Sequence, residues 1–521
     1  MPEPNLLILR RRLMSDHLTP VLAYRRLVAP DARTAPSFLF ESVEQGTTVG
    51  RWSLLGARPA VEVVAHGREV TVTDHHRGER RSMTVEDPLA VPRSITGEWT
   101  PFAPGGSPPV FHGGWVGYAG FDAVRWLEPS RLRWDAAPRD DRGLPDMHVG
   151  LYRTVVVFDH VTKVLHAVTA VPLDEHRSQA DATAAGGEAL DRLESQLERD
   201  AVLLKAAAVD LELSAPPQPP GRGPTSPEAF RTAVRTAQEY IAAGDAFQVV
   251  LSQRLERTTE ADPFEIYRAL RVVNPSPYMI YLQAAGSIMV ASSPEILCRT
   301  RGATVVNRPL AGTRRRGATP EEDAALEAEL LADPKERAEH VMLVDLGRND
   351  LGRVCETGSV EIERTMEVER YSHVMHISST VVGRMRPGLD GWDALRACLP
   401  VGTVSGAPKI RAIQIIDELE PVRRGPYAGG IGCVGWNGDI DMALALRTMV
   451  VPTAAAVEGG GRRHWRVDLQ AGAGVVLDSN PDAEYQETIS KAAALGRAID
   501  LAEAAFAPAG TGGGVQSRGI G

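Results

Sequence analysis

The sequence has little that would suit an oxidising compartment or a membrane. Its four cysteines, Cys298, Cys355, Cys398 and Cys433, lie far apart and form no C-x-x-C pair, which predicts buried free thiols. No apolar run approaches the roughly 18 residues that a transmembrane helix needs. The short apolar run in the N-terminal MPEPNLLILRRRLMS is too brief for a signal peptide. We therefore expect a cytoplasmic protein with no membrane partner.

An excess of positive charge is also missing. The chain has 57 Lys and Arg against 67 Asp and Glu, which gives a formal net charge of −10. This balance argues against nucleic acid or anionic lipid as the main partner. The 521 residues, 43% of them hydrophobic, leave room for two or three globular domains with large cores.

Proline is concentrated in LSAPPQPPGRGPTSPEAF, residues 213–230, a composition that can continue neither a helix nor a central strand. A helix is expected directly afterwards, with Ser226 as its N-cap and Pro227 at its first position. Strand-like runs dominate before this segment, whereas helices and strands mix without a regular repeat after it. This order predicts the α+β fold class with mainly antiparallel sheets.

Two segments, ADPKERAEH and SNPDAEYQE, share a plan in which a capping residue and a proline precede two acids. The acids are Glu336 and Glu339 in the first segment and Glu484 and Glu487 in the second. Capping and the helix dipole would explain one such pair. If the two helices face each other, however, four carboxylates meet and need a cation. Oxygen ligands without histidine or cysteine favour Mg²⁺ over zinc.

The glycines of GGIGCVGWNGDIDMALALRTMVV have G-x-G-x-x-G spacing, but the hairpin signal Asn437-Gly438 follows them, which excludes a dinucleotide fingerprint. Alternation then predicts one strand face with Ile440, Met442, Leu444 and Leu446 and another with Asp441, Ala443, Ala445 and Arg447. Small neighbours would let Arg447 hold an anion, although a structural ion pair explains it equally well. Gly472 and Gly474 in QAGAGVVLDSN would let backbone N–H groups reach a carboxylate, or would simply permit tight sheet packing.

Seven segments in order resemble the chorismate-utilising enzymes, and within them the large subunits of anthranilate synthase: NPSPYMIYL, SSPEILC, PLAGTRRRG, VDLGRNDLGRV, HVMHISSTV, LPVGTVSGAPK and DAEYQETISKA. The resemblance covers about residues 226–495 and continues more weakly into FLFESVEQGTTVGRWSLLG. It implies mainly antiparallel β-sheets packed as a sandwich with flanking helices. We expect a regulatory, tryptophan-binding domain at 15–212, a linker at 213–226, a chorismate-binding catalytic domain at 227–505 and a disordered tail at 506–521.

The resemblance also implies roles for individual residues. Glu339 and Glu487 would bind Mg²⁺ directly, and Glu336 and Glu484 through water. The catalytic residues would be Glu295, His376, Thr403 and Lys491. Those that hold chorismate would be Gly312, Thr313, Tyr427, Arg447, Gly472, Ala473 and Gly474. Those that bind tryptophan as a feedback inhibitor would be Glu41, Ser42, Asn274, Pro277, Tyr278 and Met279.

The implied reaction converts chorismate and ammonia to anthranilate and pyruvate. Glu295 would protonate the departing C4 hydroxyl, and His376 would take the C2 proton. Water-adding members of the family carry a lysine where this chain has Gln248, and one group of aminodeoxychorismate synthases carries a lysine in place of Ala311. Aminodeoxychorismate synthase, isochorismate or salicylate synthase and a non-catalytic regulatory subunit are the alternatives. Because no cysteine has a glutaminase-like G-x-C-x-G context, we expect a separate glutamine amidotransferase subunit and hence a hetero-oligomer.

Overall fold

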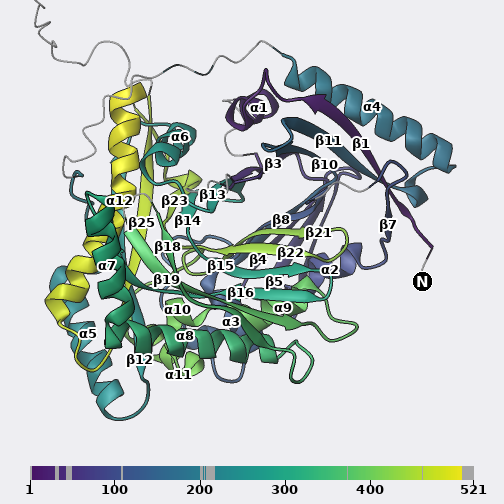
Figure 1. Cartoon of the computed structure of the whole chain (residues 1–521). Coiled ribbons are helices and arrows are strands. Elements are labelled where there is room, and N and C mark those ends of the chain that lie inside the picture. The colour runs from purple at the N-terminus through teal and green to yellow at the C-terminus, as the bar shows by residue number, and fades with distance from the viewer. Residues whose placement is uncertain are drawn as a thin grey trace, which may run out of the picture.

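The computed structural model describes residues 3–29, 35–42, 50–106, 110–199, 204, 206, 217–371, 374–459 and 462–506. The tail expected at 506–521 lies outside these residues except for its first residue, and so do residues 213–216 of the expected linker. Two large sheets make up most of the molecule (Figure 1).

In the described part of the chain the first sheet has 13 strands, and β24 (Val457–Gly459) pairs with β25 at its side. The order of the other strands is β20 (Gly406–Ala407), β12 (Gln248–Thr259), β25 (Arg462–Val475), β23 (Thr448–Pro452), β14 (Ser287–Ser293), β13 (Tyr278–Ala284), β2 (Ser37–Glu41), β3 (Trp52–Ala57), β10 (Thr154–Asp159), β11 (Val164–Pro172), β1 (Leu6–Met14) and β7 (Pro101–Phe102).

Over the same residues the second sheet has 12 strands, and β18 (Glu361–Arg370) pairs with β19. The order of the others is β17 (Leu310–Arg315), β19 (Val374–Arg384), β16 (Thr304–Arg308), β15 (Ile296–Arg301), β22 (Ile440–Leu444), β21 (Gly430–Gly435), β8 (Gly114–Ala119), β9 (Met147–Tyr152), β4 (Val61–His66), β5 (Glu69–Asp74) and β6 (Glu79–Thr84). Among the pairings of named strands, only β1 with β7 is parallel, so the expected antiparallel α+β class is confirmed.

Helices flank the two sheets. They are α1 (Pro20–Leu27), α2 (Ala90–Thr96), α3 (Val124–Leu127), α4 (Gln179–Leu197), α5 (Pro227–Ala242), α6 (Pro263–Val273), α7 (Pro320–Ala332), α8 (Pro334–Gly352), α9 (Gly391–Cys398), α10 (Gly402–Ser405), α11 (Lys409–Leu419) and α12 (Pro481–Phe506). As expected, Ser226 caps α5, accepting a hydrogen bond from the Ala229 amide, and Pro227 begins the helix. No helix in the described ranges is long and apolar enough to cross a membrane.

The sheets pack face to face, and alternation along their strands builds two cores. In β10, Val155 and Val157 join a cluster shared by both sheets, whereas Val156 and Phe158 face a second cluster formed with helices α1, α4, α6 and α12. A strand that is apolar on both faces is therefore covered by a sheet on one side and helices on the other.

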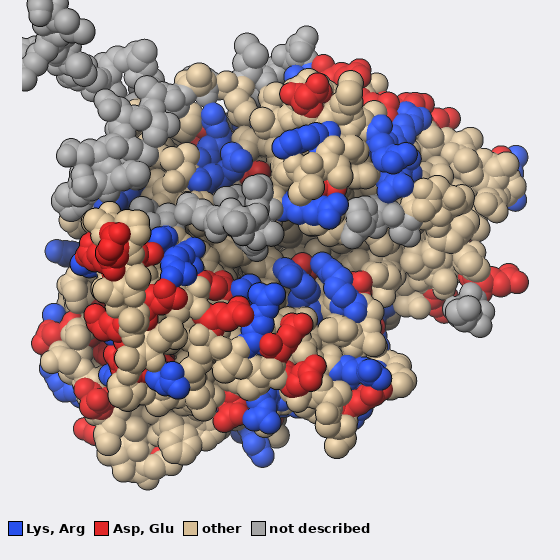
Figure 2. All heavy atoms as spheres, in the orientation of Figure 1, with Lys and Arg blue, Asp and Glu red and all other residues tan. Residues whose placement is uncertain are grey.

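Both sheets contain strands from before and after the proline-rich segment. In the first sheet β13, from the C-terminal part, pairs with β2, and in the second β21 pairs with β8; the blue and green strands of Figure 1 consequently lie side by side. The two parts predicted as domains thus share continuous sheets. On the face shown in Figure 2, basic and acidic side chains are interspersed.

One local prediction was wrong. The alternation expected through Arg447 stops at Leu444, where β22 ends, and Arg447 has a φ of 47° between β22 and β23. Such a backbone conformation is uncommon for a non-glycine residue and takes Arg447 off the strand face. The expected hairpin turn at Asn437-Gly438 is confirmed, and all four cysteines are buried and free.

A buried ion pair ties α11 to its neighbours and supplies a stability prediction. Arg424 bonds both Glu420 oxygens and the carbonyls of Val404 and Val250, while the Ser252 amide donates to Glu420. Arg424→Met should lower the free energy of unfolding by about 3–5 kcal/mol, because it leaves Glu420 buried without its cation.

Equilibrium denaturation measures this loss. The matched control is Arg192→Met, since Arg192 forms an exposed pair with Glu188 at 3.5 Å and should change stability by less than about 1 kcal/mol. Equal effects of the two substitutions would contradict the assigned role of Arg424.

Candidate functional site

Helices α8 and α12 bring the two pairs of glutamates together. Each helix begins as expected: Asp333 accepts from the Lys335 and Glu336 amides at the start of α8, and Asn480 accepts from the Asp482 and Ala483 amides at the start of α12.

Electrostatic coupling shows that the two helix starts are close. Burial raises the pKa of Glu339, and the charges of Glu336 and Glu487 raise it further. The pKa of Glu484 is raised by burial and then by the charge of Glu487. The sequence could not show that these helices meet. In the structure Glu487 of α12 lies close enough to Glu339 of α8 for its charge to raise the pKa of that residue.

Protein groups contact each of these carboxylates, and Ser479 hydrogen-bonds Glu484. Gln248 Nε2 donates to Glu339 Oε1 at 3.0 Å, Arg314 NH1 to Glu336 Oε1 at 3.0 Å, and Lys491 Nζ lies 2.6 Å from Glu487 Oε1. No group of three or more His, Cys, Asp or Glu side chains in the described ranges is arranged as a ready metal site. The all-oxygen donor set and the raised pKa values of Glu339 and Glu484 nevertheless fit a hard divalent cation.

Glu295 lies between β14 and β15 and is only 3% exposed. Its Oε1 accepts a hydrogen bond of 2.9 Å from Thr403 Oγ1. Burial raises the pKa of Glu295 to about 8, against the opposing effect of hydrogen bonds from Thr403 and the Leu310 backbone. The carboxyl therefore keeps its proton at neutral pH and can act as a general acid.

His376, on β19, is a neutral imidazole. Its Nδ1 lies 3.0 Å from the Gly312 carbonyl oxygen, which can only accept, so Nδ1 carries the hydrogen and Nε2 has the free lone pair. Arg447 NH2 lies 3.3 Å from this Nε2. Burial, followed by the charge of Arg447, lowers the pKa of His376 to about 4.

Arg447 is a guanidinium without a carboxylate partner in the described part of the chain. It is partly buried, and this burial lowers its pKa. A desolvated cation with no counter-ion is costly unless a ligand supplies the negative charge. The structural ion pair that could have explained Arg447 is therefore absent among the described residues, and a carboxylate ligand fits the position.

Close contacts explain why glycine is found at positions 312 and 474, and they show that β25 forms part of the site. A side chain at Gly312, which has a φ of 68°, would lie 3.2 Å from Glu336 Oε2, and one at Gly474 would lie 2.7 Å from Gln248 Nε2. The Lys491 ammonium donates to the Gly472 carbonyl at 2.9 Å, and the Gly472 backbone also hydrogen-bonds the Tyr427 hydroxyl. Thr313 Oγ1 lies 3.1 Å from His376 Nδ1.

Contacts thus bring together most of the residues predicted to act on chorismate. Ala473, the remaining one, lies on β25 between the two glycines and pairs with Leu251 of β12. Gln248 adds a feature that the sequence could not reveal: its Oε1 is buried and has no hydrogen-bond partner among the described residues. An unpaired amide oxygen beside these acids is suited to accept an N–H from a small nitrogen nucleophile.

A cavity of about 610 Å³ lies between the two sheets and is lined by four of the six residues predicted to bind tryptophan. Glu41, Ser42, Pro277 and Tyr278 line it. Asn274 and Met279 are not among its lining residues: the Asn274 carbonyl accepts from Ser292 Oγ, and Met279 is fully buried. Apolar side chains, Phe40 and Trp52 among them, form part of its wall.

The charged wall of this cavity contains residues that the sequence did not predict. Tyr278 OH donates to Asp441 Oδ1 at 2.8 Å, and Arg299 bonds both groups, at 3.1 Å to Asp441 Oδ2 and 2.7 Å to the Tyr278 oxygen. Arg271 forms an ion pair with Glu41, and the Tyr267 hydroxyl donates a hydrogen bond to the same carboxylate. These residues come from separate elements, and their spacing in the sequence carries no signal that they meet.

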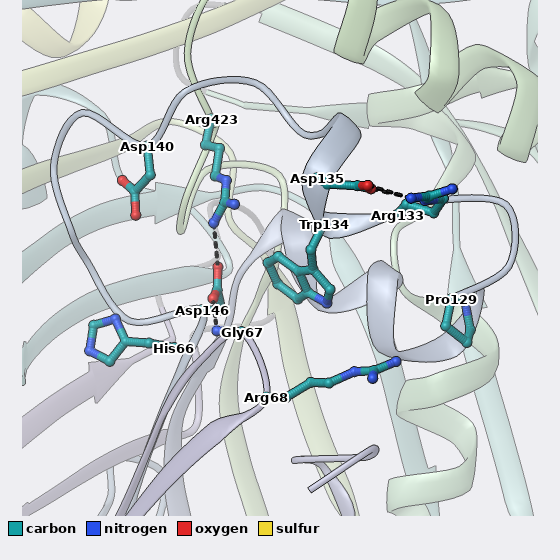
Figure 3. A pocket seen from close by; sticks show the side chains of 10 residues that line it. All are labelled: His66, Gly67, Arg68, Pro129, Arg133, Trp134, Asp135, Asp140, Asp146 and Arg423. Carbon is teal, nitrogen blue, oxygen red and sulfur yellow. Dashed lines mark hydrogen bonds and ion pairs between the residues drawn. The ribbon is translucent and has the colours of Figure 1, made fainter. Parts of the chain in front are cut away.

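Another cavity, of about 720 Å³, is shown in Figure 3 and is lined by none of the predicted residues. Arg423 reaches toward Asp146 at 3.9 Å, and the Gly67 amide donates to the same carboxylate at 2.6 Å. Burial raises the pKa of Asp146 to about 7. The other two arginines that line it have carboxylate partners, since Arg68 pairs with Glu86 and Arg133 with Asp135.

Residues 35–497 match the family of chorismate binding enzymes, and the chain belongs to that family. It is 56% identical over 513 residues to anthranilate synthase alpha subunit 1, chloroplastic, of Oryza sativa subsp. indica, which covers 96% of this chain and 89% of the relative. Anthranilate synthase component 1 of Pseudomonas putida is 44% identical over 494 residues, 94% of each chain. The crystal structure of anthranilate synthase component I from Streptococcus pneumoniae TIGR4 matches with a TM-score of 0.72 and 36% identity, over 93% of this chain and 99% of that chain.

Proposed function

We propose that the chain is the chorismate-binding subunit of an anthranilate synthase, which converts chorismate and ammonia to anthranilate, pyruvate and water. The observation that carries this proposal is the buried Glu295 carboxyl, whose pKa of about 8 preserves a proton for a poor leaving group. The names of its relatives, anthranilate synthase alpha subunits and components 1, support the same activity.

Chorismate has two carboxylates, and the site offers separate partners for them. The carboxylate of the enolpyruvyl arm would pair with Arg447, with Tyr427 and the backbone of Gly472 and Gly474 beside it. The ring carboxylate would face Glu339 and Glu487, with Glu336 and Glu484 in support. When bound there, Mg²⁺ would supply the positive charge that holds the ring carboxylate and withdraws electrons from the conjugated ring.

The first chemical step replaces the C4 hydroxyl. Glu295 donates its proton to the departing oxygen, which leaves as water, and ammonia forms a bond to C2 as the double bonds shift. Thr403, 2.9 Å from Glu295 Oε1, orients the acid. The unpaired amide oxygen of Gln248 would hold an N–H of the nucleophile, and a neutral amide cannot deprotonate water as a lysine would.

The second step makes the ring aromatic. His376 Nε2 accepts the C2 proton, the bond from C3 to the enolpyruvyl oxygen breaks, and the released enolpyruvate gains a proton to become pyruvate. An imidazole with a pKa near 4 is a weak base in the free enzyme. A bound carboxylate would cancel part of the Arg447 charge that lowers this pKa, so the substrate would strengthen its own base.

The alternatives differ in their products. Aminodeoxychorismate synthase would add nitrogen at C4 and retain the enolpyruvyl arm, isochorismate or salicylate synthase would add water, and a regulatory subunit would bind without turnover. Chromatography of the products from chorismate and ammonium separates all four cases. Anthranilate supports the proposal, and any other outcome selects one of its alternatives.

The cavity between the sheets is the proposed site for feedback inhibition by tryptophan. Its apolar wall suits an indole ring, and its charged wall, with Glu41, Arg299 and Asp441, suits an amino acid's ammonium and carboxylate groups. Strand pair β15·β22 reaches from this wall, where Arg299 pairs with Asp441, to Glu295, whose carbonyl accepts from the Leu444 amide. A ligand that moved this strand pair would shift the position of Glu295, the catalytic acid.

Ser42→Phe should raise the tryptophan concentration needed for half-inhibition by about tenfold or more, since a loss of ~1.4 kcal/mol in binding is a factor of ten. The added ring would fill space at the cavity wall. Activity with ammonium should stay within about twofold, because Ser42 has no contact with the catalytic groups. Titration calorimetry with tryptophan gives an independent readout, and unchanged binding would exclude this cavity.

The ammonia is proposed to come from glutamine through a second, amidotransferase subunit. The names of the relatives, as alpha subunits and components 1, agree with an assembly of different chains. A cytoplasmic location is part of the same proposal.

A further inference from the structure

Tyr371 lies at the end of the strand hairpin that carries the proposed base, and three hydrogen bonds fix its position. Its amide donates to the Val374 carbonyl at 2.8 Å, and its carbonyl accepts from Arg316 NH1 at 2.7 Å. Its hydroxyl donates to Glu369 Oε2 at 2.8 Å. Both the backbone and the side chain are held, so the phenol ring has a defined place beside β19.

Glu369, which accepts the hydrogen bond from the phenol, is itself anchored in the sheet. It lies on β18 directly opposite His376 of β19 in the strand register. Glu369 also forms a partly buried ion pair with Arg308 of β16. A carboxylate paired with arginine can only accept hydrogen bonds, so the Tyr371 hydroxyl is the donor. The phenol is thus tied to two strands of the sheet that carries the base.

The anchored phenol packs against the imidazole of His376. The two ring centroids are 5.6 Å apart and the ring planes are inclined at 62°, an edge-on arrangement that aromatic pairs favour. The hydrogen bond between Nδ1 and the Gly312 carbonyl holds one atom of the imidazole, and a ring held at one atom can still tilt about it. Contact with the Tyr371 ring restrains this tilt, which determines where the Nε2 lone pair points.

Tyr371 also lies near Arg447, the cation beside the imidazole. Burial and then the charge of Glu369 raise the pKa of Tyr371. The charges of Arg308 and Arg447 oppose this rise. The phenol is therefore neutral at neutral pH and keeps the hydrogen that it donates. Its ring contacts the imidazole next to the place where Arg447 NH2 approaches His376 Nε2 at 3.3 Å.

We propose that Tyr371 is a positioning residue for His376 and that it serves the second chemical step alone. This inference rests on the proposed function and adds a residue to it. In that step the C2–H bond breaks, its proton passes to His376 Nε2 and its electron pair enters the aromatic ring, while the bond from C3 to the enolpyruvyl oxygen breaks and its electrons leave on that oxygen. Tyr371 exchanges no proton and keeps the Nε2 lone pair aimed at the C2 hydrogen. The first step uses Glu295, which has no hydrogen bond to Tyr371 in the described residues.

Tyr371→Leu tests the proposal, because it removes both the ring contact and the hydroxyl. Tyr371→Phe is the second variant and retains the ring. The control is Tyr240→Leu, since the Tyr240 hydroxyl also donates to a glutamate, Glu418, but this pair joins α5 to α11. Two substrates separate the steps. Chorismate with ammonium reports both steps, whereas the intermediate that has nitrogen at C2 and retains the enolpyruvyl arm reports only the second.

With the intermediate as substrate, Tyr371→Leu should form anthranilate about 10–10²-fold more slowly than the parent, since misplacing a reacting group by ~1 Å can cost the upper value. Tyr371→Phe should lose less, because the ring contact remains. The loss of chorismate in a single turnover should stay within about threefold of the parent, and the control should match the parent with both substrates. An unchanged second step in Tyr371→Leu would overturn the proposal. So would equal slowing of both steps, which a general loss of structure would cause.

Failure of the proposed function gives a different result. A parent chain that forms no anthranilate from either substrate refutes the function, whatever the variants do. A parent chain that forms anthranilate, while Tyr371→Leu converts the intermediate at the parent's rate, leaves the function intact and overturns only the role of Tyr371.

Discussion

Replacing Glu295 with glutamine should lower turnover with ammonium by about 10²–10⁴-fold, the usual contribution of a positioned general acid. Glutamine has nearly the same shape and can still accept the hydrogen bond from Thr403, but it has no proton to give to the C4 oxygen. KM for chorismate should change little, because Glu295 makes no contact with the groups proposed to hold the two carboxylates. Steady-state kinetics separates the two parameters.

The pH dependence gives the same residue a second signature. Only the protonated carboxyl is an acid, so turnover at a constant concentration of neutral ammonia should fall as the pH rises through about 8. Glu295→Gln should lose this limb. An unchanged profile in the variant would assign the limb to another group and contradict the role of Glu295.

Stability provides the control for correct folding. Burial raises the pKa of Glu295 from 4.5 to about 8, so the folded state holds a proton that the unfolded state releases between these values. This contribution to stability is present below pH 4.5 and is lost as the pH rises toward 8. Glu295→Gln should therefore be at least as stable as the parent at pH 8–9 while nearly inactive. If the variant were inactive because it is unfolded, its kinetics would not support the role of Glu295 as an acid.

Glu487→Gln should cost about 10²-fold in kcat/KM and raise the Mg²⁺ concentration for half-maximal activity by about 10–100-fold, the range seen when support of a metal site is lost. The parent should lose activity in a chelator and regain it with Mg²⁺. The substitution removes one of the charges that raise the pKa of Glu339, so the protein should fold at least as well as before.

Asp482→Asn is the matched control for this metal ligand. Asp482 is also in the first turn of α12, but it is exposed and pairs with Arg231 at 2.6 Å. Its removal should leave the Mg²⁺ requirement unchanged. Calorimetric titration of Mg²⁺ gives a readout apart from activity. Full activity of the parent in excess chelator would refute the metal site.

Local patterns predicted the parts of the site that depend on short segments. Asp333 with Pro334 and Asn480 with Pro481 mark helix starts by chemistry that acts within one turn, and both helices begin there. The hairpin at Asn437-Gly438 was predictable for the same reason. The approach of α8 to α12 was not, because it results from how both helices pack on the sheets.

The errors and omissions have a common physical origin. Arg447 was expected on a strand face, but β22 ends at Leu444 and the backbone turns to a positive φ, which alternating side chains cannot signal. The contacts of Tyr278, Arg299 and Asp441 join three strands. Their partners are set by sheet order, and this order is a property of the whole fold.

The most direct test of the account is the product formed by the purified chain alone from chorismate, ammonium and Mg²⁺, followed by fluorescence and identified by chromatography. The proposed function predicts anthranilate and pyruvate in equal amounts, formed only with the metal and suppressed by tryptophan. Aminodeoxychorismate, isochorismate, or tryptophan binding without any turnover would contradict it.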